Sequence, residues 1–158
     1  MIDIHNFDFL IGTWNVTNRR LKERLCGCDD WEEFQAHMKT KPILNGLGLM
    51  DEMKSDHFGD MFIGLSIRMH NPQNNTWKIY WADTANPELL LKEQVVGSFS
   101  DGIGTFFGEE FYGGKKYKLR FLWKKETLDT AQWEQAYFDE NNQEWETNWT
   151  MLFKAVKN

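Results

Sequence analysis

Cysteine and proline are scarce in this sequence, with two and three residues among 158, and long apolar runs are absent. No stretch approaches the ~20 consecutive apolar residues that a membrane-spanning helix needs, so we expect no membrane partner. Residues 1–5 lack the basic and apolar segments of a secretory signal, which predicts a cytoplasmic location. Because no Pro- or Ser-rich linker divides the chain, its length predicts one domain over residues 1–158.

The two cysteines are separated by one residue, in Cys26-Gly27-Cys28. Neighbours this close on an extended chain are too near each other for an unstrained disulfide, so we expect two reduced thiols. A zinc site would need two further soft ligands at suitable spacing, and the sequence has no second cysteine pair. We therefore expect no metal site.

Positive charge is also limited, because 18 Lys and Arg face 24 Asp and Glu and the formal net charge is −6. Nucleic-acid binding draws on clustered Lys and Arg to neutralise phosphates, so no nucleic-acid partner is expected. The one basic stretch, residues 19–24, is interpreted as the solvated face of a strand.

Aromatic residues are abundant, at 15% of the chain, and many of them fall at every second position. A period of two places alternate side chains on one face of a sheet, so a bulky apolar face opposite a charged face indicates a strand with one buried side. Three runs show this pattern, with these residues on one face: Tyr117, Leu119, Phe121 and Trp123; Trp145, Thr147, Trp149, Met151 and Phe153; Trp77, Ile79 and Trp81.

Clusters of Gly, Asn and Asp separate the runs, at residues 45–48, 71–75, 113–114 and 139–142. These residues tolerate the positive φ of hairpin turns. The spacing predicts about ten strands with short connections, which is typical of an all-β meander, and closure into an antiparallel up-and-down β-barrel removes exposed edges.

Two segments of the sequence are candidates for helices. Residues 30–38 fit both a helix and a strand, and Pro42 with the glycines after it favours a strand that enters a turn. The only other helix expected is a short N-terminal one over residues 3–10, with Phe7 and Leu10 facing inward.

Gly12-Thr13-Trp14 follows a short apolar segment and opens the first predicted strand. It resembles the Gly-x-Trp signature of lipocalins and related calycin barrels, in which the Trp closes one end of the barrel and a basic side chain from a late strand packs over it. The resemblance implies a calycin/lipocalin-like barrel in which Lys154, where Arg is usual, makes that cation–π contact with Trp14.

Nearly the whole chain resembles a narrower group. Three stretches in the same order carry this resemblance: FLIGTW at 9–14, PILNGLG at 42–48 followed by Asp51-Glu52, and WETNWTM at 145–151. They are similar to the bacterial lipocalin-like family catalogued as domain of unknown function fifteen-seventy-nine. The resemblance implies a bacterial calycin barrel and no established activity.

A barrel of about ten strands is wider than side chains alone usually fill, so the aromatic strands predict the wall of an interior cavity. We expect it to bind a small hydrophobic or amphipathic molecule, largely apolar and with room for an acidic group. Arg68 is the predicted polar anchor, because a guanidinium suits a carboxylate or phosphate, although either face of its strand could point inward. The other cavity candidates are Trp14, Tyr80, Trp81, Glu93, Tyr117, Trp123, Tyr137 and Trp149.

No cofactor is expected. The nitrobindins, a sister calycin family, bind haem through a His on a late strand, and this sequence has no His beyond His70. Neighbouring carboxylates such as Glu109-Glu110 point to opposite faces of a strand, so no catalytic array is recognisable. Two alternatives stay open: an isomerase or decarboxylase that uses Tyr80, Arg68 and Glu93, and a filled barrel that acts through homodimerisation.

Overall fold

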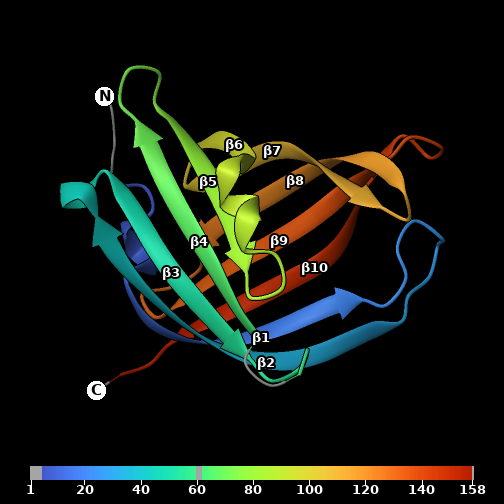
Figure 1. Cartoon of the computed structure of the whole chain (residues 1–158), viewed down its shortest axis with the longest axis horizontal. Helices are drawn as coiled ribbons and strands as arrows, with labels where there is room; N and C mark the ends of the chain where they lie inside the picture. Colours follow the sequence, from blue (N-terminus) through green and yellow to red (C-terminus); the bar gives the residue numbers. More distant parts are fainter. Residues whose placement is uncertain (1–4, 60–61, 158) are drawn as a thin grey trace.

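The computed structural model describes residues 5–59 and 62–157, in which ten antiparallel strands close into a barrel (Figure 1). Each strand pairs with the next along the chain, and β10 pairs with β1 to close the ring. The predicted all-β, calycin/lipocalin-like, up-and-down barrel is therefore confirmed. The strands are β1 Gly12–Leu21, β2 Trp31–Ile43, β3 Gly48–Ser55, β4 Phe62–Asn71, β5 Thr76–Asp83, β6 Glu93–Ser100, β7 Ile103–Tyr112, β8 Lys115–Lys125, β9 Thr130–Asp139 and β10 Glu144–Ala155.

Helical structure in the described residues is confined to short 3-10 turns: η1 Asp8–Leu10, η2 Leu44–Gly46 and η3 Pro87–Leu91. None of them has the length and apolar character needed to cross a membrane. The helix expected over residues 3–10 is reduced to the single turn η1, and residues 3 and 4 lie outside the described ranges. Residues 31–38 belong to strand β2, which confirms the strand prediction for that segment.

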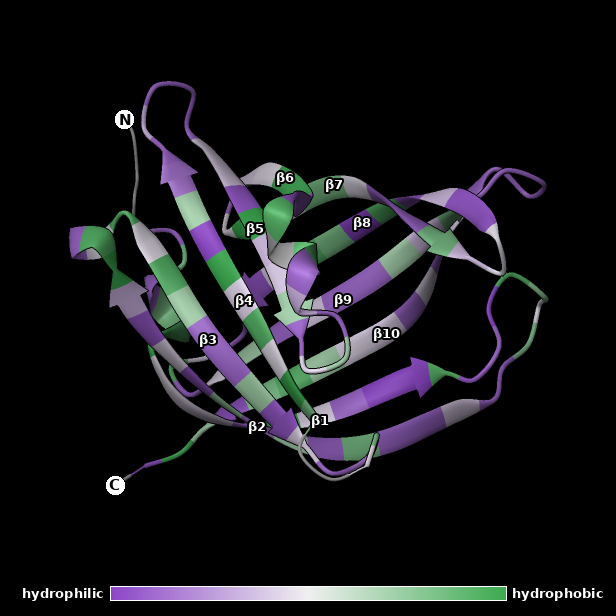
Figure 2. Ribbon diagram, viewed as in Figure 1, coloured by the Kyte–Doolittle hydropathy of each residue, from purple (hydrophilic) through white to green (hydrophobic). Residues whose placement is uncertain are grey.

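The alternation predicted for β8 is confirmed, since Leu119, Phe121 and Trp123 are buried. Arg120 and Leu122 between them are half-buried on the other face, and the flanking Lys118 and Lys124 are exposed. Strand β4 has the opposite arrangement. Polar and apolar residues alternate along its ribbon (Figure 2). Its polar residues Ser66 and Arg68 are buried in the barrel, and its apolar residues alternate with them on the half-buried outer face. The interior is therefore aromatic over β8 and polar along β4.

The face predicted for the start of β10 is wrong. A β-bulge between Thr147 and Trp149 shifts the register against β9, so the residues before it change face. Trp149, Met151 and Phe153 point inward as predicted, whereas Trp145 lies opposite the half-buried Phe138 on the outer face. The bulge also brings Asn148 into the interior, where it is fully buried.

The end of the barrel that holds η1, at the left of Figure 1, is closed by Phe7. This side chain is fully buried, and its ring lies 5.0 Å from that of Trp77 and 4.8 Å from that of Phe99, in edge-to-face geometry. The rings of Phe106 and Trp123 lie 5.6 and 5.9 Å away. We call the opposite end, formed by the β1–β2 loop (residues 22–30) and the β7–β8 and β9–β10 turns, the mouth (right side of Figure 1).

The predicted contact between Lys154 and Trp14 does not form. Trp14 lies opposite Ala155, and Lys154 alternates to the outer face, opposite Asn15. The indole of Trp14 instead donates a hydrogen bond of 2.7 Å to the carbonyl of Leu10 and packs edge-on against Phe153. Trp14 therefore holds η1 at the closed end of the barrel, and no basic side chain of the described residues takes part in this contact.

Candidate functional site

The structure places the predicted cavity residues in three different regions. Trp14, Arg68 and Trp123 face inward in the closed half, next to Phe7. In the mouth half, the ring of Trp81 lies over Gly64, and the other inward-facing residues there are Tyr117, Tyr137 and Trp149. Tyr80 and Glu93 lie opposite each other on the outer face, because Tyr80 alternates with the buried Ile79.

Arg68 points into the barrel, but a carboxylate already occupies it. Its guanidinium forms a buried ion pair with Asp51, and both side chains are 3% exposed. The rings of Phe7 and Trp123 cover the guanidinium, with centroids 5.3 and 5.1 Å from Cζ. Burial raises the pKa of the Asp51 carboxyl above its usual value, and the Arg68 charge opposes that rise. The neutralised Arg68 therefore cannot serve as the free anion anchor that the sequence suggested.

Halfway along the barrel lies a band of buried amides. The indole Nε1 of Trp149 donates to Asn18 Oδ1 at 2.9 Å, and Gln135 Nε2 donates to Asn148 Oδ1 at the same distance. An indole can only donate, so Asn18 must present its oxygen to Trp149. In this arrangement the amide nitrogens of Asn18 and Asn148 have no hydrogen-bond partner among the described residues.

At the mouth, three side chains form a hydrogen-bonded array. Arg24 Nη1 donates to the hydroxyl oxygen of Tyr137 at 2.6 Å, and that hydroxyl donates to Glu110 Oε2 at 2.6 Å. Burial, followed by the charge of Glu110, raises the pKa of Tyr137, so its hydroxyl stays protonated and acts as a donor. Tyr117 stacks on Tyr137 with ring centroids 5.9 Å apart. Arg24 forms no ion pair with any described residue, which makes it the available cation of this array.

A second charged group consists of Arg20, Glu32 and His57. Arg20 Nε donates to Glu32 Oε1 at 2.8 Å, and His57 Nε2 lies 3.3 Å from Glu32 Oε2. The guanidinium of Arg20 also lies over the rings of Phe58 and Trp149, at 4.6 and 5.1 Å. Arg20 is therefore held by both a carboxylate and aromatic faces.

The lowered pKa of the Glu32 carboxyl predicts that the free energy of unfolding depends on pH. Its hydrogen bond from Arg20 is the largest influence and holds its pKa below the usual 4.5, against the opposing effect of burial. Because the folded pKa is lowered, the stabilisation is complete above pH 4.5 and is lost as pH falls through the folded pKa. The free energy of unfolding should therefore decrease less on acidification in Glu32→Gln than in the natural protein. The expected difference is less than about 1 kcal/mol, measured by urea unfolding at several pH values. The outward-facing Glu33→Gln is the matched control, and an equal change in both variants would contradict the assignment.

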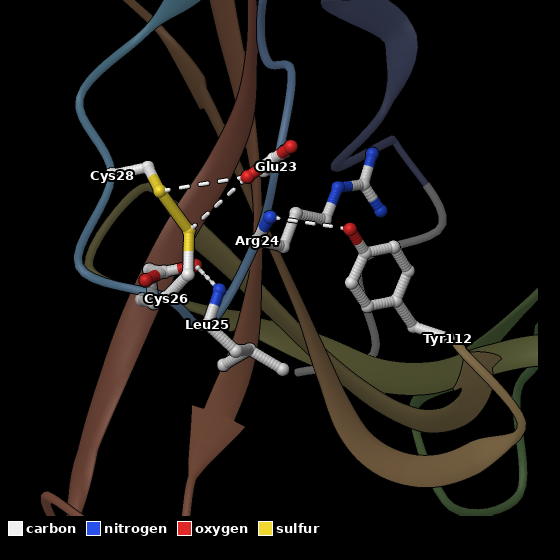
Figure 3. The surroundings of a disulfide bond; sticks show 7 residues. Glu23, Arg24, Leu25, Cys26, Cys28 and Tyr112 are labelled. Atoms are coloured by element: carbon white, nitrogen blue, oxygen red, sulfur yellow. Dashed lines mark hydrogen bonds between the residues drawn. A yellow bond between two sulfur atoms is a disulfide. The ribbon is translucent and has the colours of Figure 1, made fainter.

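The prediction of two reduced thiols is wrong, because Cys26 and Cys28 form a disulfide with Cα atoms 5.3 Å apart (Figure 3). The prediction assumed an extended chain, but β1 ends at Leu21 and the cysteines lie in the loop beyond it. Gly27 has a φ of +71°, and this left-handed turn brings both cysteine side chains to the same side of the loop. Glu23 joins the two sulfurs in a cluster whose potential ligand atoms all lie within 4.8 Å of one another. Sulfurs bonded to each other are not thiolates, so this state offers no thiolate ligands.

Two hollows lie on the outside of the barrel. One, of about 350 Å³, lies beside the closed end, where Phe9, Phe99 and Lys125 contribute to its lining. The other, of about 440 Å³, lies over β7 and β8 and is lined in part by Phe107, Lys118 and Trp145. The lining of neither hollow includes Asn18, Gln135, Asn148 or Trp149.

Sequence reasoning missed Asn18, Arg24 and Asn148. Asn18 could have been found, because it continues the inward series of Trp14 and Val16 and is a polar residue at a core-facing position. Arg24 was grouped with a solvated strand face, yet it lies beyond the end of β1 and folds back over the mouth. No local signal identifies Asn148, since its inward position depends on the bulge.

Comparison with known proteins gives the fold and no more. No family model matches the chain, and no curated protein matches it. Among solved structures, it is similar to Rv2717c from M. tuberculosis, with a TM-score of 0.60 and 10% sequence identity over 98% of this chain and 97% of that one. At this identity the likeness supports the barrel alone.

Proposed function

We propose that this protein binds a small, largely apolar molecule with an acidic or carbonyl group in the interior of its barrel. The observation that carries the proposal is a pair of fully buried amide nitrogens, on Asn18 and Asn148, for which residues 5–59 and 62–157 provide no hydrogen-bond partner. A buried donor without an acceptor costs about 1–3 kcal/mol, and a ligand oxygen would remove that cost. The donors lie among the rings of Trp149, Trp133 and Phe34, which suit an apolar body.

The mouth supplies the features that a ligand would meet on entry. Arg24 provides a cation without a carboxylate partner among the described residues, and Tyr137 provides a protonated hydroxyl beside it. An acidic group could therefore bind at Arg24 while the apolar part lies deeper. The enzyme alternative loses its predicted trio, because Arg68 lies inside the closed half and Tyr80 and Glu93 lie outside the barrel.

The first experiment is native mass spectrometry of freshly purified protein, followed by titration with the amphipathic aromatic anion 8-anilinonaphthalene-1-sulfonate. A ligand mass that is lost on denaturation would support interior binding. Replacing Asn18 with leucine should weaken binding of the probe by about three- to tenfold, since one hydrogen bond is removed. Asn15→Leu, three positions earlier on the outer face of β1, should leave it unchanged. Equal affinities for both variants and the natural protein would remove the amide band from the site.

Self-association is the second candidate function, and the outer face of β4 favours it. Leu65, Ile67 and Met69 form a half-buried apolar stripe there, flanked by Met50 and Tyr80 on the neighbouring strands. Apolar stripes on an outer sheet face are typical of contacts between subunits. The same native mass spectrum would show twice the chain mass if this interpretation is correct.

A further inference from the structure

The disulfide between Cys26 and Cys28 lies in the exposed part of the β1–β2 loop (Figure 3). An external thiolate can reach either sulfur without unfolding of the barrel, because both cysteines are exposed. Exposed disulfides of this kind are the ones that exchange with other thiols, whereas those that hold a fold together are usually buried.

The disulfide also does little to hold the fold together. It joins residues separated by only two positions, and the entropic stabilisation from a cross-link grows with the length of the loop that it closes. The barrel is closed by the ladder between β1 and β10, which does not involve the loop. A role in thiol chemistry therefore accounts for the Cys26–Cys28 disulfide better than a role in stabilising the fold.

Arg24, a member of the mouth array, and Leu25 lie just before Cys26, and hydrogen bonds connect both of them to distant strands. The backbone N–H of Arg24 donates to the Tyr112 hydroxyl at 3.2 Å, and its side chain donates to Tyr137 at 2.6 Å. The backbone N–H of Leu25 donates to Glu146 Oε1 at 2.7 Å. Leu25 adopts a φ of 61°, a left-handed conformation that a leucine rarely occupies unless its surroundings enforce it. Leu25 is held by its hydrogen bond to Glu146 and directly precedes the short ring that the disulfide closes.

Glu23 distinguishes the two oxidation states. Its Oε2 lies 4.0 Å from Sγ of Cys26 and 3.8 Å from Sγ of Cys28. Disulfide sulfurs carry no hydrogen, so these contacts become S–H···O hydrogen bonds only after reduction. The same carboxylate repels an incoming thiolate, which slows attack on the disulfide.

We propose that Cys26-Gly27-Cys28 is a thiol–disulfide exchange site, and that its oxidation state sets the position of Arg24 and Leu25 at the mouth. A thiolate of an external dithiol attacks one sulfur, the S–S bond breaks, and the departing cysteine thiolate takes up a proton. The second thiol of the reagent, as its thiolate, attacks the mixed disulfide, releases the other cysteine and becomes oxidised itself. The protein gains two electrons and two protons. This goes beyond the proposed ligand binding and can be tested without a ligand.

The test is reduction of the full chain with dithiothreitol under native conditions. Cysteine content is followed by alkylation and mass, strand content by circular dichroism, and amide hydrogen exchange by mass spectrometry. We expect both cysteines to become alkylated with strand content unchanged, and exchange at the Arg24 and Leu25 amides to rise about fivefold, as for loss of one hydrogen bond. Exchange at Leu119, inside β8, should stay constant. A disulfide that resists reduction until the barrel unfolds, or reduction that leaves both loop amides unchanged, would overturn the proposal.

Two variants add independent readouts. The double variant Cys26→Ser/Cys28→Ser should show the fast loop exchange of the reduced protein and no response to dithiothreitol. Glu23→Gln should react with dithiothreitol up to about fivefold faster at low salt, because one charge near 4 Å is removed, with a smaller gain at high salt. The control is Glu140→Gln, in the exposed β9–β10 turn. A rate unchanged in Glu23→Gln would refute the role of the carboxylate.

Discussion

Replacing Phe7 with alanine is expected to lower the free energy of unfolding by about 3–5 kcal/mol. The side chain is fully buried at the closed end and contacts the rings of Trp77, Phe99, Phe106 and Trp123. Those rings belong to four different strands, so they cannot all move inward to fill the space that the smaller side chain leaves. The loss therefore combines the transfer energy of the ring with the cost of a residual cavity.

The measurement for Phe7→Ala is urea unfolding followed by tryptophan fluorescence and by circular dichroism. The matched control is Phe111→Ala, because Phe111 lies on the outside and is 71% exposed. The control should change stability by less than about 0.5 kcal/mol. A loss below about 1 kcal/mol in Phe7→Ala would mean that the closed end repacks and that Phe7 does not seal it.

Asp51→Ala is the second variant with a large expected effect, a loss of about 3–5 kcal/mol. Removing the carboxylate leaves the guanidinium of Arg68 buried between two aromatic rings without its counter-charge. The two interacting rings moderate this cost but cannot replace the charged Asp51 Oδ2 that accepts a hydrogen bond from Arg68 Nη1. The effect should be visible as a lower urea midpoint with an unchanged denaturant slope.

The double variant Asp51→Leu/Arg68→Met distinguishes the attraction within the ion pair from the desolvation cost of its two charges. Removing both charges also removes both desolvation costs, and the raised pKa of the Asp51 carboxyl shows that burial penalises its ionised form. The double variant should therefore recover most of the stability lost in Asp51→Ala. If the double variant is as unstable as the single one, the ion pair itself stabilises the fold and the desolvation argument is wrong.

The barrel itself could be predicted because its strands follow local rules. Alternation in β8 and the turn at Gly113-Gly114 each depend on residues close in sequence, and both appear in the structure as expected. Residues 31–38 form a strand although their apolar spacing also fits a helix, because pairing with β1 and β3 decides the outcome.

The site could be predicted only in part, because its chemistry depends on partners far apart in the chain. Alternation shows that Arg68 shares a face with Ser66, but it cannot show that Asp51 neutralises it. One extra residue in β10 moves Trp145 outward and Asn148 inward, and no sequence period reveals it. The disulfide was missed for a related reason, since the backbone at Gly27 rather than the cysteine spacing brings the sulfurs together.

The order of strands around the barrel has a consequence for folding. Every ladder joins strands that are consecutive in the chain, apart from the one between β1 and β10. The hairpins can therefore form early from short loops, while the closing ladder must bring together residues as far apart as Trp14 and Ala155. Until that last ladder forms, β1 and β10 are two open edges on one curved sheet. Another copy of the chain can pair with either edge during this interval, so slow closure would appear as concentration-dependent aggregation during refolding.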